Sequence, residues 1–253
     1  MYLVDSHCHI DQIDIPDLLS QAKEAGVGHM LCVCITLTDF PKMLSMVQPY
    51  SYISASVGLH PNETVEQEPT AKELIVLAQP EKVVAIGETG LDYYRTTGDV
   101  KFQQERFRQH IHAARTVKKP LIIHTRQARE DTMAILRAEK ANEVSGVMHC
   151  FTEDWAMAKA ALDLGFYISF SGIITFKNAV EIQEVAKQVP LDRMLIETDS
   201  PYLAPNPYRG KTNQPAYVRY VAEYIASLRG ISLEKVAEHT TNNFFNLFKG
   251  AKK

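Results

Sequence analysis

The sequence predicts an α/β fold, a single-domain (β/α)8 TIM barrel that spans residues 1–253. Short apolar runs alternate with longer amphipathic stretches along the whole chain, which is typical of repeated β-then-α units. Histidine and carboxylate residues close several of the apolar runs. The chain contains no linker, low-complexity tract or internal repeat that would divide it.

The apolar runs predict eight strands, near residues 2–6, 28–35, 52–58, 83–87, 120–124, 146–149, 166–170 and 194–198. Several are continuous apolar segments. Such segments are expected where both faces of a parallel sheet are covered. Eight β-then-α units with short connections favour a closed barrel over an open, doubly wound sheet.

The amphipathic stretches predict helices near residues 16–26, 39–47, 69–79, 99–118, 127–141, 153–164, 177–188, 214–229 and 232–248. Pro16 and Pro69 suit helix starts, because proline is tolerated in the first turn. Gly26 and Gly165 follow helical runs, where a left-handed residue commonly ends the helix. Pro120 cannot continue a helix and therefore marks the end of the longest one.

The composition is that of an ordinary globular protein, with 45% hydrophobic residues and a net charge of −3. The surface as a whole does not favour a polyanion, so any affinity for nucleic acid must be local. No segment has the pattern of a signal peptide or of a membrane span. The four cysteines lie in strand-like segments without a C-x-x-C pair, which predicts reduced core thiols. We expect a cytoplasmic monomer that contacts no membrane.

Residues with metal-binding side chains stand at the C-terminal ends of the predicted strands: His7, His9, Glu88, His124, His149 and Asp199. The side chains of a strand alternate between its two faces, so the first two histidines share a face. The C-terminal strand ends of a barrel meet at one place. Imidazole and carboxylate ligands are typical of hydrolytic divalent-metal sites. The pattern therefore predicts a metal-dependent hydrolase.

Six ligands are too many for one tetrahedral zinc with an open position, so we expect two divalent cations (Mg, Mn or Zn). Glu88 is the natural bridge, because the fourth strand lies between the two groups of ligands. Glu88, Asp199 and a bridging hydroxide do not fully neutralise two divalent cations. The remaining positive charge favours an anionic substrate, and a metal pair can activate a water.

Four further residues are candidate substrate contacts near the same mouth. His60 ends the third strand, and Arg126 follows His124 by two residues. Arg209 and Lys211 lie in the irregular segment 200–215. Guanidinium and ammonium groups bind phosphate oxygens, but a structural or solvated surface role remains the alternative for each of the four. The remaining histidines are expected to be structural: His29, His110, His112 and His239.

Other types of active site find no support, because the chain lacks a G-x-S-x-G elbow, a phosphate-binding P-loop and a G-x-G-x-x-G motif. The metal-binding segments instead closely resemble those of the TatD family of metal-dependent deoxyribonucleases, in particular its YcfH-like branch. The resemblance covers essentially the whole chain. It rests on DSHCH (5–9), GLHP (58–61), GETGLDYY (87–94), HTR (124–126), HCF (149–151) and ETDSPYL (197–203).

This resemblance implies an amidohydrolase-type TIM barrel with two metals. One metal would take His7, His9, Glu88 and Asp199, and the other would take Glu88, His124 and His149. Two departures concern neighbouring positions: Thr152-Glu153 replaces the usual Ser-Gly, and Thr89 replaces an aliphatic residue. Neither departure removes a ligand. Glu153 adds a negative charge near the mouth, which disfavours tight binding of a long polyanion.

The leading hypothesis is a deoxyribonuclease, a 3′–5′ exonuclease on single-stranded DNA, with polarity suggested by the family only. Asp199 would accept a proton from the attacking water, and Glu88 would bridge the metals. One alternative is a D-aminoacyl-tRNA deacylase or another amidohydrolase-type ester or amide hydrolase. Cyclic-amide hydrolases often use a carboxylated lysine on the fourth strand, where Lys82 lies at the wrong end. A non-catalytic interaction barrel is the third hypothesis.

Overall fold

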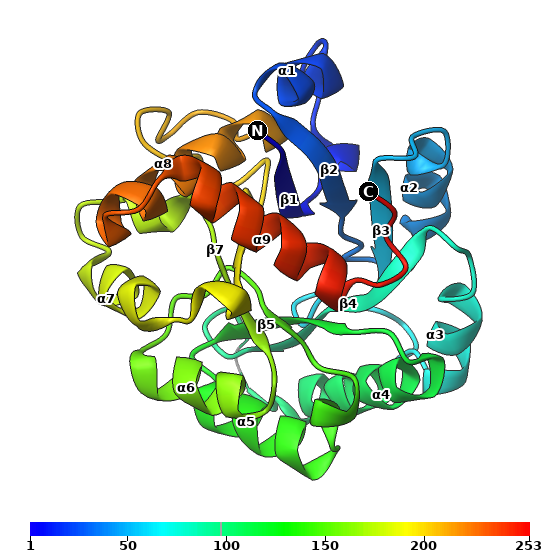
Figure 1. The fold of residues 1–253 in the computed structure, drawn as a ribbon. Coiled ribbons are helices and arrows are strands. Elements are labelled where there is room, and N and C mark those ends of the chain that lie inside the picture. Colours follow the sequence, from blue (N-terminus) through cyan, green and yellow to red (C-terminus); the bar gives the residue numbers. More distant parts are fainter. Residues whose placement is uncertain (97) are drawn as a thin grey trace.

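The computed structural model describes residues 1–96 and 98–253. Within these ranges eight parallel strands form one sheet in sequence order, which confirms the predicted (β/α)8 barrel (Figure 1). The strands are β1 (Leu3–Cys8), β2 (Val27–Cys32), β3 (Ile53–Val57), β4 (Val83–Asp92), β5 (Leu121–Arg126), β6 (Gly146–Met148), β7 (Tyr167–Phe170) and β8 (Met194–Ile196).

Helices surround the sheet (Figure 1). The α-helices are α1 (Leu18–Glu24), α2 (Phe40–Val47), α3 (Ala71–Leu77), α4 (Lys101–Val117), α5 (Arg129–Ala138), α6 (Trp155–Asp163), α7 (Val180–Gln188), α8 (Val218–Arg229) and α9 (Leu233–Leu247). Short 3₁₀ turns are η1 (Ile10–Gln12), η2 (Ala141–Glu143), η3 (Gly172–Thr175), η4 (Leu191–Arg193) and η5 (Pro215–Tyr217).

The predicted element boundaries need three corrections. Pro16 and Pro69 lie just before helices rather than inside them, since α1 begins at Leu18 and α3 begins at Ala71 after a Thr70 cap. The stretch 214–229 begins as the 3₁₀ turn η5 and becomes α-helical only in α8. The fourth strand does not end at residue 87 but continues to Asp92.

The seam between β8 and β1 closes at the C-terminal ends of the strands. The His9 N–H donates to the Ser200 carbonyl (2.8 Å), and the Asp199 N–H donates to the His7 carbonyl (2.9 Å). An isolated bridge between Cys8 and Ser200 extends this pairing. The backbone of predicted metal ligands therefore completes the barrel.

A buried carboxyl group reinforces the same seam. Asp5 of β1 accepts hydrogen bonds from the Thr198 N–H (2.8 Å) and the Thr198 hydroxyl (2.6 Å). Burial raises the pKa of Asp5 to about 8, although the bonds from Thr198 oppose this shift. Asn213 in turn donates from Nδ2 to the Thr198 carbonyl (2.8 Å), which ties the loop after β8 to the seam.

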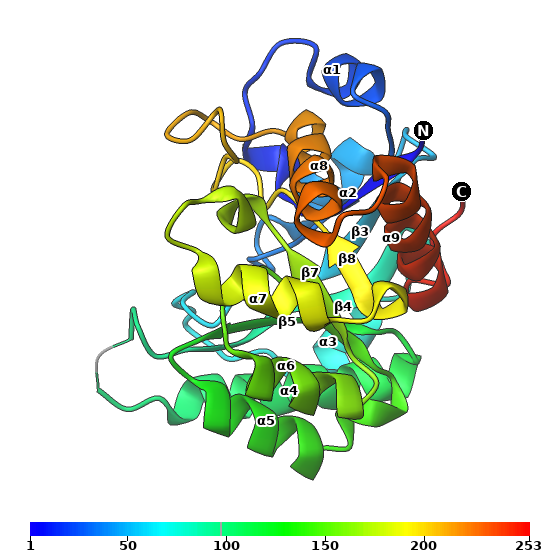
Figure 2. The ribbon, with the colours of Figure 1, turned by 60° about the vertical axis from the view of Figure 1, so that its left-hand side comes forward.

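The helix α9 covers the opposite end of the barrel. The Asn243 amide donates to the Leu191 and Met194 carbonyls, where β8 begins. Its apolar face joins a core cluster with residues of the strands, including Val4, Leu31, Val84, Ile122, Val147, Tyr167, Leu195, Phe244, Leu247 and Phe248. Figure 2 shows α9 and both chain ends on one side, and the loop after β8 (gold) on the other. No helix in the described part of the chain combines the length and apolarity of a membrane span.

His110 of α4 is a structural residue, as predicted. Its Nε2 accepts a hydrogen bond from the Leu59 N–H (3.0 Å), and its Nδ1 lies 2.8 Å from the Arg106 carbonyl. Burial lowers the pKa of His110 to about 4, so the ring stays neutral and keeps its acceptor nitrogen. This bond holds the segment after β3 that leads to His60.

The stability of the fold should therefore depend on pH through His110. Between pH 6.5 and 4 the His110 ring is protonated in the unfolded chain but stays neutral in the folded protein. The contribution of His110 to the free energy of unfolding is therefore fully present above pH 6.5 and decreases toward pH 4. Going from pH 7.5 to 5 should cost about 2 kcal/mol at this residue. His110→Gln keeps an acceptor for Leu59 but does not titrate. Chemical denaturation at both pH values should show a smaller loss in the variant, and an equal loss in both proteins would contradict the assignment.

Candidate metal centre

His7 and His9 follow the start of a β-bulge in β1 and project to the same face. Asp5 pairs with Met30 and Cys8 pairs with Cys32, so three steps along β1 match two along β2. The two Nε2 atoms of His7 and His9 lie 3.2 Å apart. Cys8 points the other way and donates from Sγ to the Leu31 carbonyl, within the core cluster shared with the helices. The predicted alternation of side chains is confirmed.

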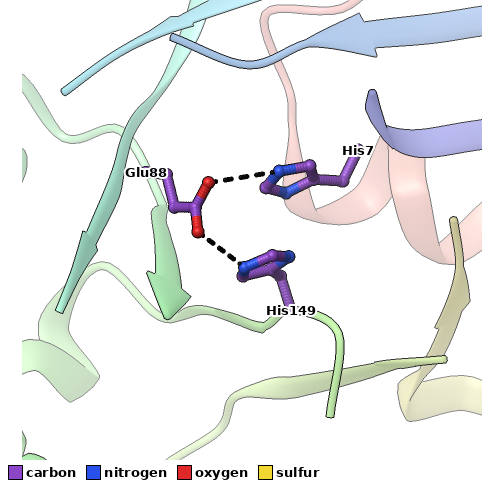
Figure 3. A group of neighbouring side chains, drawn as sticks. All are labelled: His7, Glu88 and His149. Carbon is purple, nitrogen blue, oxygen red and sulfur yellow. Dashed lines mark hydrogen bonds and ion pairs between the residues drawn. The ribbon is translucent and has the colours of Figure 1, made fainter. Parts of the chain in front are cut away.

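Glu88 of β4 faces both His7 and His149 with its carboxylate (Figure 3). Its Oε2 is 3.4 Å from His7 Nε2, and its Oε1 is 2.8 Å from His149 Nε2. The same Oε1 lies 3.1 Å from His124 Nδ1 and 3.4 Å from His60 Nε2. One carboxylate thus contacts histidines that lie in or just after four different strands.

Asp199 faces the histidines of β1 from just beyond β8. Its Oδ1 lies 3.4 Å from His9 Nε2 and 3.6 Å from His7 Nε2. Its φ of 57° falls in the left-handed region, which aspartate tolerates better than most residues. The side chains of Asp199, His60 and His124 are 15, 16 and 19% exposed, whereas His7 and Glu88 are almost fully buried. The first three therefore form the part of the site that water reaches.

Three overlapping groups of these side chains are able to hold a metal ion: His7, His9 and Asp199; His7, Glu88 and His149; His60, Glu88 and His124. In each group the ligand atoms lie within 4.8 Å of one another. His60, expected to contact substrate, thus belongs to a potential metal group. His7 is buried, and its Nδ1 has no hydrogen-bond partner among the described residues. Its Nε2 faces only nitrogen and carboxylate atoms, a donor set that fits a divalent cation.

The charges of the site are strongly coupled. Burial alone would raise the pKa of Glu88, but His149, His60 and His124 outweigh it and hold that pKa well below its usual range. Burial would lower the pKa of His149, but Glu88 and Glu197 raise it well above the ordinary value. Glu88 is therefore ionised and is stabilised by positive charge around it.

Sequence reasoning gave no role to Asp92, at the end of β4. Its Oδ2 lies 3.1 Å from His124 Nε2 and accepts from the Asn62 amide (2.9 Å). Asp92 is therefore a partner that fixes the orientation of the His124 ring. The sequence contained one signal for Asp92: it follows Glu88 by four residues, an even spacing that places both side chains on the same face of a strand. Gly90 between them has a φ of 137°, and a Cβ there would lie 2.0 Å from the His124 carbonyl oxygen, so only glycine permits this strand pairing.

Glu197 has the corresponding place beside His149. Its Oε1 lies 3.2 Å from His149 Nδ1 and accepts from the Cys150 N–H (2.7 Å). The side chain is fully buried. Because the other ring nitrogen of His149 faces Glu88, Glu197 sets the direction in which His149 presents its Nε2. Its position two residues before Asp199 was the only sequence signal.

The predicted cationic contacts divide into two kinds. The Arg126 guanidinium lies 3.8 Å from the centroid of the Tyr94 ring, and Arg126 pairs with Asp92 across β4 and β5. The Arg209 guanidinium lies over Phe176, 4.2 Å from its centroid, and Lys211 is exposed in the same loop. No contact of these two side chains with the histidine cluster is found among the described residues.

The acidic departure at Glu153 is electrostatically compensated. Its Oε2 accepts from the Arg129 guanidinium at 2.8 and 3.1 Å, and Asp154 accepts from the same group at 2.5 Å.

Each of the four cysteines is a free thiol, and Cys8, Cys32 and Cys34 are buried. His29 is also structural, as predicted, since it lies 2.9 Å from the Ser54 hydroxyl beneath α9.

Comparisons with known proteins agree with this geometry. The chain is 51% identical over 258 residues to the metal-dependent hydrolase YcfH of Escherichia coli (strain K12), covering 98% of this chain and 96% of that protein. It is 30% identical over 242 residues to the 3′–5′ ssDNA/RNA exonuclease TatD of Salmonella typhimurium, covering 93% of each. The crystal structure of YJJV, a TatD homologue from Escherichia coli K12, superposes with a TM-score of 0.86 at 27% identity and covers 98% of both chains.

More distant structures share the fold. An amidohydrolase from Saccharomyces cerevisiae is 18% identical and superposes with a TM-score of 0.85, covering 98% of this chain and all of that one. A family model described as TatD related DNase matches residues 4–249. The match extends from β1 through α9 and includes every residue of the candidate metal groups. The chain therefore belongs to the TatD family, and it is a metal-dependent hydrolase of that family.

Proposed function

We propose that this protein is a phosphodiesterase that removes nucleotides from the 3′ end of single-stranded DNA. The observation that carries the proposal is Glu88, which belongs to two of the potential metal groups, the one with His7 and His149 and the one with His60 and His124. This arrangement suits a pair of divalent cations. Bound there, such cations lower the pKa of a water and stabilise the charged oxygens of a phosphodiester. The printed activity of the Salmonella relative supports the choice of substrate.

Asp199 is proposed as the proton acceptor of the reaction. Burial would raise its pKa, but the bond to His9 and the nearby charges of His7 and His149 lower that pKa below the ordinary value. The carboxylate is therefore ionised at neutral pH, and it reaches the water-accessible side of the site. His149 and His124 lie on the opposite side of the site. Glu197 orients the His149 ring, and Asp92 orients the His124 ring.

The charge of the protein favours a single strand over a duplex. With a net charge of −3, the protein offers no broad basic surface that would bind a duplex along its length. Arg126 would supply a local phosphate contact near the cut, and Arg209 and Lys211 would bind further along the strand. We include a monomeric, cytoplasmic enzyme in the proposal, because the buried free thiols suit a reducing compartment.

Glu88 should be required for both metals. Glu88→Ala removes the carboxylate, and Glu88→Gln keeps its volume but not its charge. Titration with Mn²⁺ or Zn²⁺ should give two ions per chain in the wild type and a loss at both sites in the variants. Glu234→Ala, at an exposed position of α9 on the opposite end, is the matched control and should bind two. Full occupancy in folded Glu88→Gln and Glu88→Ala would refute the shared role of this residue.

Asp199→Asn should lower kcat by roughly 10²- to 10⁴-fold, because the amide cannot accept the proton of the attacking water. The KM for a short single-stranded DNA should change much less, since the side chain keeps its size. Asp163→Asn, at an exposed site in α6, controls for the loss of one carboxylate. The proposed proton transfer is wrong if metal-loaded Asp199→Asn has a kcat near that of the wild type.

A circular single strand separates end trimming from internal cutting. The linear form of the same sequence should be degraded from its 3′ end, in a reaction that EDTA stops, while the circle persists. Equal degradation of both forms would replace the exonuclease with an endonuclease. Hydrolysis of D-aminoacyl-tRNA but of neither DNA form would favour the deacylase activity instead.

A further inference from the structure

Two exposed tyrosines flank the metal centre. Tyr94 is 57% exposed and Tyr202 is 53% exposed, which is more than any other aromatic side chain in the described part of the chain. Each follows a carboxylate of the site within three residues: Tyr94 follows Asp92, and Tyr202 follows Asp199. Their positions are therefore fixed by the same strand ends that position the metal-binding groups.

The Tyr202 ring is held in place although it is exposed. Its centroid lies 6.3 Å from that of His9, at an interplanar angle of 67°. Its hydroxyl donates to Gln12 Oε1 (3.1 Å). Its N–H donates to the Asp199 carbonyl (2.9 Å), and its carbonyl accepts from the Asn213 amide (2.6 Å). An aromatic ring fixed at both ends and open to solvent loses little entropy when a flat ligand stacks on it.

Tyr94 forms a composite surface with Arg126. The Tyr94 N–H donates to Asp92 Oδ1 (3.1 Å), which fixes the backbone. The Arg126 guanidinium lies 3.8 Å from the ring centroid, a cation–π contact that holds the cation against the ring. This explains how Arg126, at the end of β5, is held without a carboxylate partner among the residues described.

The two tyrosines lie beside different metal groups. Tyr202 is next to His9 and Asp199, in the group built from β1 and β8. Tyr94 is tied through Asp92 to His124, in the group that His124 forms with Glu88 and His60. A phosphodiester between the two groups would have an aromatic surface on each side. The bases that flank a phosphodiester in a single strand are the flat groups that such surfaces accept.

We propose that Tyr202 is a nucleobase-stacking subsite, and that Tyr94 carries Arg126 as a combined stacking and phosphate contact on the other side of the cut. The proposal deepens and rests on the proposed nuclease function. Stacking requires a base but does not read its identity, because every base has an aromatic face. The enzyme should therefore act on all four bases and discriminate against a strand that lacks bases at the cut.

The first test compares single strands that carry either ordinary or abasic nucleotides at the two 3′-terminal positions. The wild type should cleave the base-carrying strand with a kcat/KM about 5- to 100-fold higher, the range that stacking of one base provides. Tyr202→Leu should remove most of this preference, mainly through KM. Tyr202→Phe keeps the ring and should keep the preference, although it loses the bond to Gln12. An equal fall on both strands in Tyr202→Leu would assign Tyr202 a structural role and overturn the subsite.

A binding test separates the subsite from the nuclease function. The probe is a strand with 2-aminopurine at its 3′ end and a phosphorothioate at the last linkage, mixed with the metal-loaded protein. Stacking should quench the fluorescence with the wild type and Tyr202→Phe but not with Tyr202→Leu. Quenching without hydrolysis of ordinary DNA would reject the nuclease function and retain the subsite. Hydrolysis with neither quenching nor a preference for bases would retain the nuclease and reject the subsite.

Discussion

Closure of the barrel at the β8–β1 seam is the constraint on which the site depends. The peptide groups of His7, His9 and Asp199 make the hydrogen bonds that join the last strand to the first. The side chains of these residues are consequently brought within 3.6 Å of one another by the fold itself. The bulge in β1 is needed as well. The residues of β1 before the bulge pack in the core, and the extra residue in the bulge turns His7 toward the inside of the barrel. The half of the site that contains His7, His9 and Asp199 therefore assembles when the barrel closes.

Glu88 sets the electrostatics of the other half. A fully buried carboxylate is costly unless positive charge surrounds it, and here four histidines lie within 3.4 Å of its oxygens. His149 and His124 carry that charge most readily, because their carboxylate partners raise the pKa of both rings. The arrangement therefore suits whichever positive charge is present. The partners Asp92 and Glu197 hold two of the rings from behind, so the rings keep their direction in either case.

The strand periodicity and the polar strand ends were sufficient to predict the barrel and the residues that gather at its mouth. The extension of β4 was missed because the glycines on either side of Glu88 interrupt the apolar run that marks a strand. Asp92 and Glu197 could not be assigned from the sequence, because their function is defined by histidines on other strands. Arg209 lies over Phe176, a contact between two loops that periodicity does not encode.

The packing of α9 has a practical consequence for handling the protein. Lys253 Nζ lies 5.1 Å from the centroid of the Tyr2 ring, and the Thr241 hydroxyl donates to the Tyr2 carbonyl, so residues 2 and 253 share the face that α9 covers. That face lies away from the loop after β8 (Figure 2). An affinity tag, a fluorescent fusion or a surface tether joined at either residue 1 or residue 253 would point away from the substrate entrance. Immobilised protein would thus present its mouth to solution in a uniform orientation.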